Sequence, residues 1–223
     1  MERDGVLSLR HASAGYGGRP VLVDIDLDIH AGDKIAVMGR SGAGKSTLLG
    51  LLYAQRPDAI ALVPQAAALV RSLSVFHNVY MGRLDRHSTM VNLRTLLWPQ
   101  RADKDAIGDV LASIGLSDKM FAAAGTLSGG QQQRTSVARA LYNGRSILLA
   151  DEPVSALDRV QGADVLELIK KRHETLIVVM HDVGLALEHC DRIVVLENGC
   201  KIIDAPATDL SAKDLLGRFG AAA

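Results

Sequence analysis

The sequence predicts an α/β fold in which a mostly parallel sheet is flanked by helices. Short, continuously apolar segments that are typical of buried strands, such as 147–150 and 175–180, alternate with segments of helical periodicity. A glycine-rich loop follows one apolar segment, 35–38, and an acidic pair follows another. Because a parallel sheet binds its ligand at the carboxyl ends of its strands, these polar groups are expected to form one site.

Length and composition limit the domain organisation and the functional classes that the chain can have. The chain has 223 residues, which suits one α/β domain or one such domain with a small helical insert. Lys+Arg and Asp+Glu number 25 each, so no overall charge argues for nucleic acid or an acidic membrane surface. The first residues lack the apolar core of a signal peptide, and no run approaches the roughly 18 apolar residues of a spanning helix. Any membrane role is therefore expected to be peripheral.

The two cysteines, Cys190 and Cys200, are too few and wrongly spaced for a metal site. We expect them to be reduced thiols, as in a cytosolic protein.

The glycine-rich loop at 39–46, here called the phosphate loop, reads GRSGAGKS and fits G-x-x-x-x-G-K-[ST] at every fixed position. Its glycines let successive backbone N–H groups turn inward toward phosphate oxygens, and the following helix adds its positive N-terminal end. Lys45 supplies a charge for the β- and γ-phosphates, and the Ser46 hydroxyl can ligate Mg²⁺. A glycine turn that binds nothing is the alternative. The combination of strand, loop and helix favours a nucleoside triphosphate site.

Residues 6–11 and 21–30 alternate apolar and polar side chains, which predicts a half-exposed antiparallel strand pair. Tyr16 lies in the glycine-rich turn between them. It is either an ordinary exposed turn aromatic or a side chain that stacks on a purine base near the phosphate loop.

The middle of the chain is expected to contain one short strand, 60–64, that delivers Gln65 at its end. Helices are expected over 46–54 and 72–81, and over 104–115 with Asp103 as its cap. The stretch 81–101 between the last two helices is polar and arginine-bearing.

A second glycine-rich helix start follows at 127–134, which reads LSGGQQQR. By the same electrostatics it is a second potential anion site. The alternative is a capped helix, with Ser128 or a glycine at the cap.

The strand 147–150 ends in Asp151 and Glu152, the acidic partner that a phosphate loop requires. We assign Asp151 to Mg²⁺ and Glu152 to the attacking water, because successive strand side chains point in opposite directions. A solvated acidic strand end is the alternative. His181 ends the strand 175–180 and emerges from the same sheet edge, which favours a contact with the γ-phosphate. Together these elements predict a Mg²⁺–nucleotide hydrolase.

The remaining elements follow the same alternation. Helices are expected over about 160–173, 183–190 and 211–219, and the strands 192–197 and 200–204 flank Asn198-Gly199, the strongest short hairpin signal.

With LSGGQ placed between the phosphate loop and the acidic strand, nearly the whole chain resembles the ATP-binding cassette family of P-loop NTPases. In this resemblance Tyr16 is the adenine-stacking aromatic, Gln65 the Q-loop, 127–131 the signature, 155–158 the D-loop and His181 the H-loop. The resemblance implies a single cassette with a core of about 1–70 and 145–223, a helical subdomain of about 71–144, and a head-to-tail dimer that encloses two ATP molecules.

The resemblance also implies roles for individual residues. The ATP contacts within one subunit are Tyr16, Gly39, Arg40, Ser41, Gly42, Ala43, Gly44, Lys45, Ser46, Thr47 and Gln65. The contacts to the partner subunit's nucleotide are Ser128, Gly129, Gly130, Gln131 and Asp158. The Mg²⁺ ligands are Ser46, Gln65 and Asp151, and the catalytic residues are Glu152 and His181.

Within the family, the stretches 78–99, 127–134, 148–158 and 210–220 are similar to those of ATP-binding subunits of phosphonate-type importers. This implies an ATPase on the cytoplasmic face of the inner membrane that partners integral membrane permease subunits, with a solute-binding protein acting indirectly. The basic stretch 81–101 is either part of the permease interface or a solvated charged face.

Two features depart from the family pattern. The segment between Lys45 and Gln65 is short, so the antiparallel β-subdomain is expected to be trimmed, and Arg159 stands where a proline is usual.

A competing function is a soluble cassette in DNA repair, chromosome mechanics or ribosome work, whose members carry inserts or second cassettes. A small-molecule kinase is a third hypothesis, in which the LSGGQ segment has no role. The neutral charge offers no phosphate-tracking surface for nucleic acid.

Overall fold

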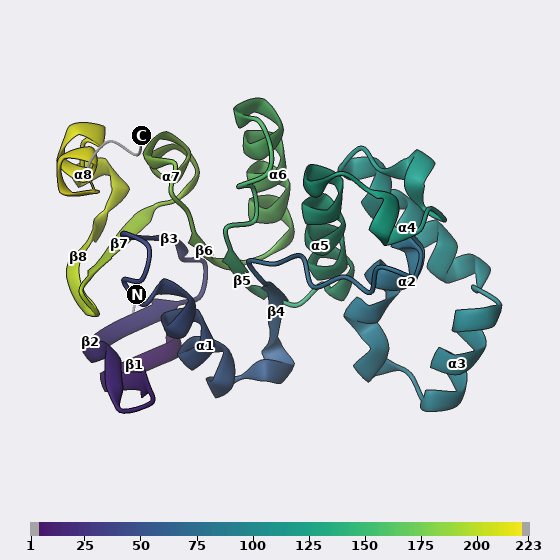
Figure 1. The fold of residues 1–223 in the computed structure, drawn as a ribbon, viewed down its shortest axis with the longest axis horizontal. Coiled ribbons are helices and arrows are strands. Elements are labelled where there is room, and N and C mark those ends of the chain that lie inside the picture. Colours follow the sequence, from purple (N-terminus) through teal and green to yellow (C-terminus); the bar gives the residue numbers. More distant parts are fainter. Residues whose placement is uncertain (1–4, 220–223) are drawn as a thin grey trace.

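The computed structural model describes residues 5–219. A six-stranded sheet forms its centre, with a separate two-stranded sheet and one helix on one face and helices on the other (Figure 1). A group of helices from the middle of the chain lies beyond the β4 end of the large sheet (Figure 1). The predicted α/β class, a mostly parallel sheet flanked by helices, is confirmed.

The large sheet has the strand order β4-β5-β6-β3-β7-β8, and only the β7–β8 pair is antiparallel. Its strands are β3 (Lys34–Met38), β4 (Ile60–Val63), β5 (Ile147–Asp151), β6 (Thr175–Val179), β7 (Arg192–Glu197) and β8 (Cys200–Pro206). Ile35 and Val37 of β3 face one core, and Ala36 and Met38 face the other. Burial on both faces explains why the central strands are continuously apolar.

The two faces of the sheet are covered by different elements. The core on one side contains α1 (Lys45–Gln55) and the two-stranded sheet of β1 (Gly5–Tyr16) and β2 (Arg19–His30). The core on the other side contains α6 (Arg159–Arg172), α7 (Val183–His189) and α8 (Ala212–Phe219). Within residues 5–219, no helix combines the length and the apolar character needed to cross a bilayer.

The middle helices are α2 (Val75–Tyr80), α3 (Thr89–Leu97), α4 (Arg101–Ser113) and α5 (Gly129–Asn143). Short 3₁₀ segments connect the elements: η1 (Pro57–Ala59), η2 (Met81–Arg86), η3 (Ser117–Lys119), η4 (Ala124–Thr126) and η5 (Ala207–Asp209). In Figure 1, α5 stands between the sheet and the other middle helices, and it contacts α2, α4, α6 and β4.

The prediction that Asp103 caps the fourth helix is wrong. The helix begins at Arg101, so Asp103 lies inside its first turn and the N-cap position belongs to Gln100. The Asp103 carboxylate instead accepts a hydrogen bond from the Tyr142 hydroxyl at 3.1 Å. The acid therefore joins α4 to α5.

The stretch 81–101 is less polar than its arginines indicated. It contains η2 and α3, and Met90, Leu93 and Trp98 are 79%, 58% and 68% exposed. Arg83 is not free in solvent, since its guanidinium carbon lies 4.2 Å from the centroid of the Tyr142 ring. The exposed surface of this stretch therefore mixes large apolar side chains with charged ones such as Arg86 and Arg94.

The β7–β8 hairpin forms at Asn198-Gly199 as predicted, with positive φ at both residues (48° and 80°). A Cβ on Gly199 would lie 2.5 Å from the Val21 carbonyl oxygen, so the close approach of the hairpin to β2 requires glycine. The Val23 N–H donates to the Gly199 carbonyl at 2.9 Å and fastens the hairpin to β2.

Strand β4 forms one edge of the large sheet and has only four residues. On this edge Arg145 donates to the Ile60 carbonyl at 3.3 Å and to the Pro57 carbonyl at 3.4 Å. The same guanidinium forms an ion pair with Asp85 of η2.

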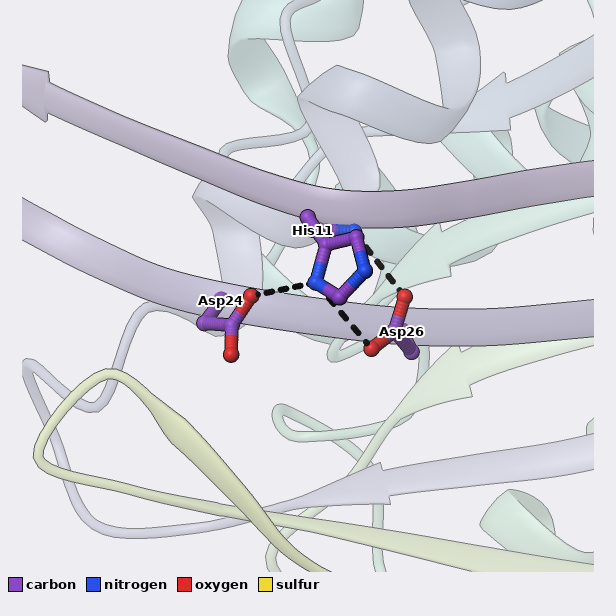
Figure 2. A group of neighbouring side chains, drawn as sticks. All are labelled: His11, Asp24 and Asp26. Carbon is purple, nitrogen blue, oxygen red and sulfur yellow. Dashed lines mark hydrogen bonds and ion pairs between the residues drawn. The ribbon is translucent and has the colours of Figure 1, made fainter.

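The β1–β2 pair confirms the predicted antiparallel strands, but its register shifts several times. His11 and Asp24 have positive φ (46° and 54°). As Figure 2 shows, Asp24 and Asp26 approach His11 from the opposite strand: His11 Nδ1 lies 2.8 Å from Asp24 Oδ1, and the His11 N–H donates to Asp26 Oδ1 at 2.9 Å. These contacts hold the irregular middle of the pair together.

The hydrogen bond to Asp24 and the charge of Asp26 raise the pKa of His11 above its ordinary value of 6.5. A raised pKa in the folded state stabilises the fold fully below the unfolded pKa, and this contribution is lost as pH rises through the folded pKa. We expect His11→Ala to reduce the free energy of unfolding more at about pH 5.5 than at about pH 8.5 in denaturant titrations. Asp24→Asn should bring the His11 pKa, followed by NMR, back toward its ordinary value. Equal losses at both pH values would contradict the assignment.

Candidate functional site

The phosphate loop leads from β3 into α1 and has the backbone geometry that the glycines predict. Gly39, Gly42 and Gly44 have φ values of 149°, 80° and 100°. A Cβ on Gly39 would lie 2.3 Å from the Leu196 carbonyl oxygen, so this position has no room for a side chain. The loop is therefore held close to β7.

The N-terminal end of α1 is open to a ligand. Gly44 is its N-cap residue, and neither a side-chain cap bond nor an acidic residue in the first turn occurs among the described residues. Unsatisfied N–H groups and the helix dipole both favour an anion at such an end.

Lys45 places its ammonium inside the phosphate loop. The side chain is only 7% exposed, and Nζ donates to the Gly39 and Arg40 carbonyls at 2.7 and 3.0 Å. Burial lowers the pKa of Lys45, and the nearby Glu152 and Asp151 carboxylates oppose this shift. The cation is thus positioned before any phosphate arrives.

Asp151 is the last residue of β5 and is 7% exposed. Its carboxylate makes no hydrogen bond or ion pair with any of the residues 5–219. The charge of Asp151 still acts on the nearby Lys45 ammonium, but its oxygens stay available to ligate a cation, which carboxylates do readily. Ser46, at the exposed start of α1, offers a hydroxyl from the neighbouring element.

Glu152 follows directly but does not continue the strand, since its φ is 52°. The sequence-based reason for separating the two acids, strand alternation, is therefore wrong: the left-handed backbone turns Glu152 away. Its Oε1 lies 2.8 Å from His181 Nε2 and 3.4 Å from Gln65 Nε2. Gln65 lies two residues beyond the end of β4, and His181 two residues beyond the end of β6.

Gln65, Glu152 and His181 line one cleft of about 240 Å³ together with the phosphate loop and its neighbours, whereas Asp151 is not among the lining residues. Its lining is drawn from the phosphate loop, from three residues at the carboxyl ends of other strands and from β2: Val21, Ser41, Gly42, Gly44, Lys45, Ser46, Thr47, Gln65, Glu152 and His181. The cleft combines an anion cradle with a carboxylate–imidazole–amide cluster, which is the chemistry needed to hold a triphosphate and orient a water molecule.

Other predicted site residues lie outside this lining. Tyr16 ends β1 with 71% of its surface exposed. Asp158 caps α6 through a 2.9 Å bond from the Gln161 N–H.

The signature turn, Ser128–Gly130, starts α5 and also lies outside the cleft lining. The Ser128 hydroxyl accepts from the Gln131 N–H at 3.3 Å, and the Gln131 side chain accepts from the Ser128 N–H at 3.0 Å. This is the capped helix of the sequence-based alternative. The same helix end retains a positive dipole, so a cap and an anion contact are compatible.

Sequence reasoning missed two polar residues of α5 that connect to the site. The Gln133 side-chain amide donates a hydrogen bond to the Glu152 carbonyl. Arg139 donates to the Ala67 and Ala68 carbonyls just after Gln65, at 3.2 and 2.9 Å. Gln133 lies four residues before Val137 on the buried face of the helix. A polar side chain on an apolar helical face was the signal that could have found it.

A family model described as ABC transporter matches residues 22–155. The chain belongs to the ABC transporter family. The resemblance inferred from the sequence is confirmed, and the chain is an ABC-type ATPase with a P-loop NTPase fold.

Similar ABC proteins extend over nearly the whole chain. The chain is 36% identical over 253 residues to the phosphonates import ATP-binding protein PhnC of Caulobacter vibrioides, covering 99% of this chain and 95% of that one. It is 37% identical over 247 residues to PhnC 2 of Pseudomonas aeruginosa, covering 97% and 90%.

Among solved structures, the dimeric bacterial ABC transporter cassette MJ0796 matches with a TM-score of 0.81 and 25% identity, covering 91% of this chain and 99% of that chain. A dimeric post-hydrolysis state of the same cassette, bound to ADP and Pi, matches with a TM-score of 0.75.

We expect Lys45→Ala to weaken ATP binding about 10- to 100-fold, because the phosphates lose a charge-assisted hydrogen bond. Equilibrium binding of a fluorescent ATP analogue measures the change. Lys104→Ala, at an exposed lysine of α4, is the matched control and should bind like the wild type. Equal affinity of both variants would contradict the role of the phosphate loop.

Proposed function

We propose that this chain is the ATP-hydrolysing, energy-coupling subunit of an importer for phosphonate or a related small solute. The nucleotide cleft carries the ATPase part of the proposal, since it joins a phosphate loop to the Glu152–His181 pair. The substrate class is supported by the names of the PhnC proteins, which are similar over nearly their full length.

For catalysis, we propose that Ser46, Asp151 and Gln65 hold Mg²⁺. When bound, this ion would offset charge on the phosphate oxygens. Asp151 fits the role because its largely buried carboxylate forms no hydrogen bond or ion pair within residues 5–219, which leaves its oxygens available to a cation. Glu152 orients the attacking water, and His181 contacts the γ-phosphate. The two side chains hold each other in place, since His181 Nε2 lies 2.8 Å from Glu152 Oε1. In such a site, positioning and electrostatics supply most of the rate enhancement.

We further propose that two copies pair head to tail and that each completes the other's site. The signature turn, with Gln131 and Asp158, would meet the nucleotide held by the partner's phosphate loop. Two observations support this: the turn lies outside the lining of its own subunit's cleft, and the similar cassette MJ0796 is a dimer. Tyr16, exposed at the end of β1, would stack on the adenine base.

The permease is proposed to dock beside α3, on the cytoplasmic face of the membrane. A cavity of about 320 Å³ lies there, lined mainly by apolar side chains that include Leu73, Leu84, Leu93 and Leu96. An apolar helix face of an integral membrane subunit suits this lining. The cassette would then divide into a core of about 1–70 and 145–223 and a helical subdomain of about 71–144 that carries the docking cavity.

We expect Glu152→Gln to lower the rate of ATP hydrolysis about 10²- to 10⁴-fold while ATP stays bound. With MgATP this variant should elute as a dimer in size-exclusion chromatography. Adding Ser128→Arg should return it to the monomer, because the arginine blocks the signature turn. Adding Ser128→Ala removes the hydroxyl but introduces no bulk or charge, so it should weaken the dimer far less than Ser128→Arg.

A Glu152→Gln variant that hydrolyses ATP at the wild-type rate would contradict the catalytic assignment. A dimer that persists with Ser128→Arg would contradict the shared site.

We expect Leu93→Glu to reduce co-purification with the permease at least about tenfold, because a charge would be buried in an apolar contact. ATP binding should be unchanged. Met90→Glu is the matched control, since Met90 lies on the same helix and is exposed, but does not line the cavity. Equal recovery of the permease with both variants would contradict the docking surface.

A further inference from the structure

The backbone of Glu152 is held in place from both sides. A left-handed conformation at a non-glycine residue costs about 1–3 kcal/mol and persists only where the surroundings enforce it. On one side, the Glu152 N–H donates to the Val179 carbonyl of β6 at 3.1 Å. On the other side, the Glu152 carbonyl accepts hydrogen bonds from Gln133 and from the Ser155 hydroxyl.

Both the nitrogen and the oxygen of the Gln133 side-chain amide hydrogen-bond to the loop that begins at Glu152. Its Nε2 donates to the Glu152 carbonyl at 2.5 Å and to the Ser155 hydroxyl at 3.1 Å. Its Oε1 accepts from the Ala156 N–H at 2.7 Å. The side chain is 9% exposed, so these bonds form in a largely water-free environment, where they are stronger.

The helix that carries Gln133 begins at the signature turn. Ser128 is the N-cap of α5, and a Cβ on Gly130 would lie 3.0 Å from the Ala156 carbonyl oxygen. The first two turns of α5 therefore touch the loop after Glu152 at two places. These contacts join the signature turn to that loop over a short path.

The same helix also holds the second partner of Glu152. Arg139 donates to the Ala67 and Ala68 carbonyls in the segment that follows Gln65. Burial lowers the pKa of Arg139, and Ala68 has a φ of 47°. Gln65 and Glu152, which meet at 3.4 Å, are thus both carried by segments bonded to α5.

We propose that Gln133 is a positioning residue for Glu152 and that, through it, contact of the signature turn with the partner's nucleotide sets the geometry of this subunit's own catalytic carboxylate. The inference rests on the proposed shared site. It adds a route within one protomer by which occupancy of one ATP site controls hydrolysis at the other. Its central residue, Gln133, is not among the residues proposed to contact either nucleotide.

Gln133→Met removes the three hydrogen bonds and keeps a side chain of similar length. We expect kcat for ATP to fall about 10²-fold, because the catalytic group loses its fixed position. The affinity for ATP should stay within about twofold of the wild type, since the phosphate loop is untouched. Gln132→Met is the matched control: within residues 5–219 the Gln132 side-chain amide donates only to the Leu127 carbonyl, and its loss should leave kcat unchanged.

Gln133→Glu gives a readout that packing alone would not produce. A protonated carboxyl group can donate to the Glu152 carbonyl and accept from the Ala156 N–H, as the amide does, whereas a carboxylate cannot donate. Buried carboxyl groups with such partners have raised pKa values. We therefore expect kcat of this variant, relative to the wild type at the same pH, to rise as pH falls from about 9 to about 6.

The results distinguish the positioning role of Gln133 from the catalytic role of Glu152. A Gln133→Met variant with wild-type kcat, or a Gln132→Met variant with an equal loss, would overturn the positioning role. If Gln133→Met fails to fold, the pH dependence of Gln133→Glu decides. A ratio of its kcat to the wild-type kcat that rises as pH falls supports the role, and a ratio that is constant or falls overturns it. Wild-type activity in Glu152→Gln would instead reject the catalytic assignment itself.

Discussion

Two buried opposite charges dominate the site, and no ion pair among the described residues joins them. The Lys45 ammonium is satisfied by loop carbonyls, while the Asp151 carboxylate makes no hydrogen bond within residues 5–219. Taking these charges out of water opposes folding even though they lie near each other, and the sheet must be stable enough to hold them at its edge. Its doubly covered strands provide that stability. A triphosphate with its cation suits both groups at once.

The helical half of the molecule takes part in the same arrangement through α5. This helix starts at the capped signature turn, bonds to the backbone beside Glu152 and Gln65, and packs on α2 and α4. The apolar cavity beside α3 lies in the same helical group. Helix α2, which packs on α5, supplies His77 and Tyr80 to that cavity, so nucleotide chemistry and permease docking, as proposed, would be connected through this packing.

The sequence predicted the elements whose chemistry is local. The phosphate loop, the hairpin and the buried strands follow from glycine geometry and hydrophobic periodicity, and they formed where expected. The missed features depend on tertiary contacts. Asp103 had the chemistry of a cap but bonds to Tyr142, and the left-handed φ of Glu152 is imposed by β6 and α5. Gln133 looked like one more polar helix residue because only the packed loop gives it partners.

The short segment before Gln65 has a consequence for solubility. This segment includes β4, the outer strand of the large sheet, where an unprotected row of peptide groups could recruit another chain. Arg145 occupies carbonyls on this border, and its pairing with Asp85 places opposite charges there. A bound carbonyl and a charged pair at a sheet edge both oppose strand addition by another chain.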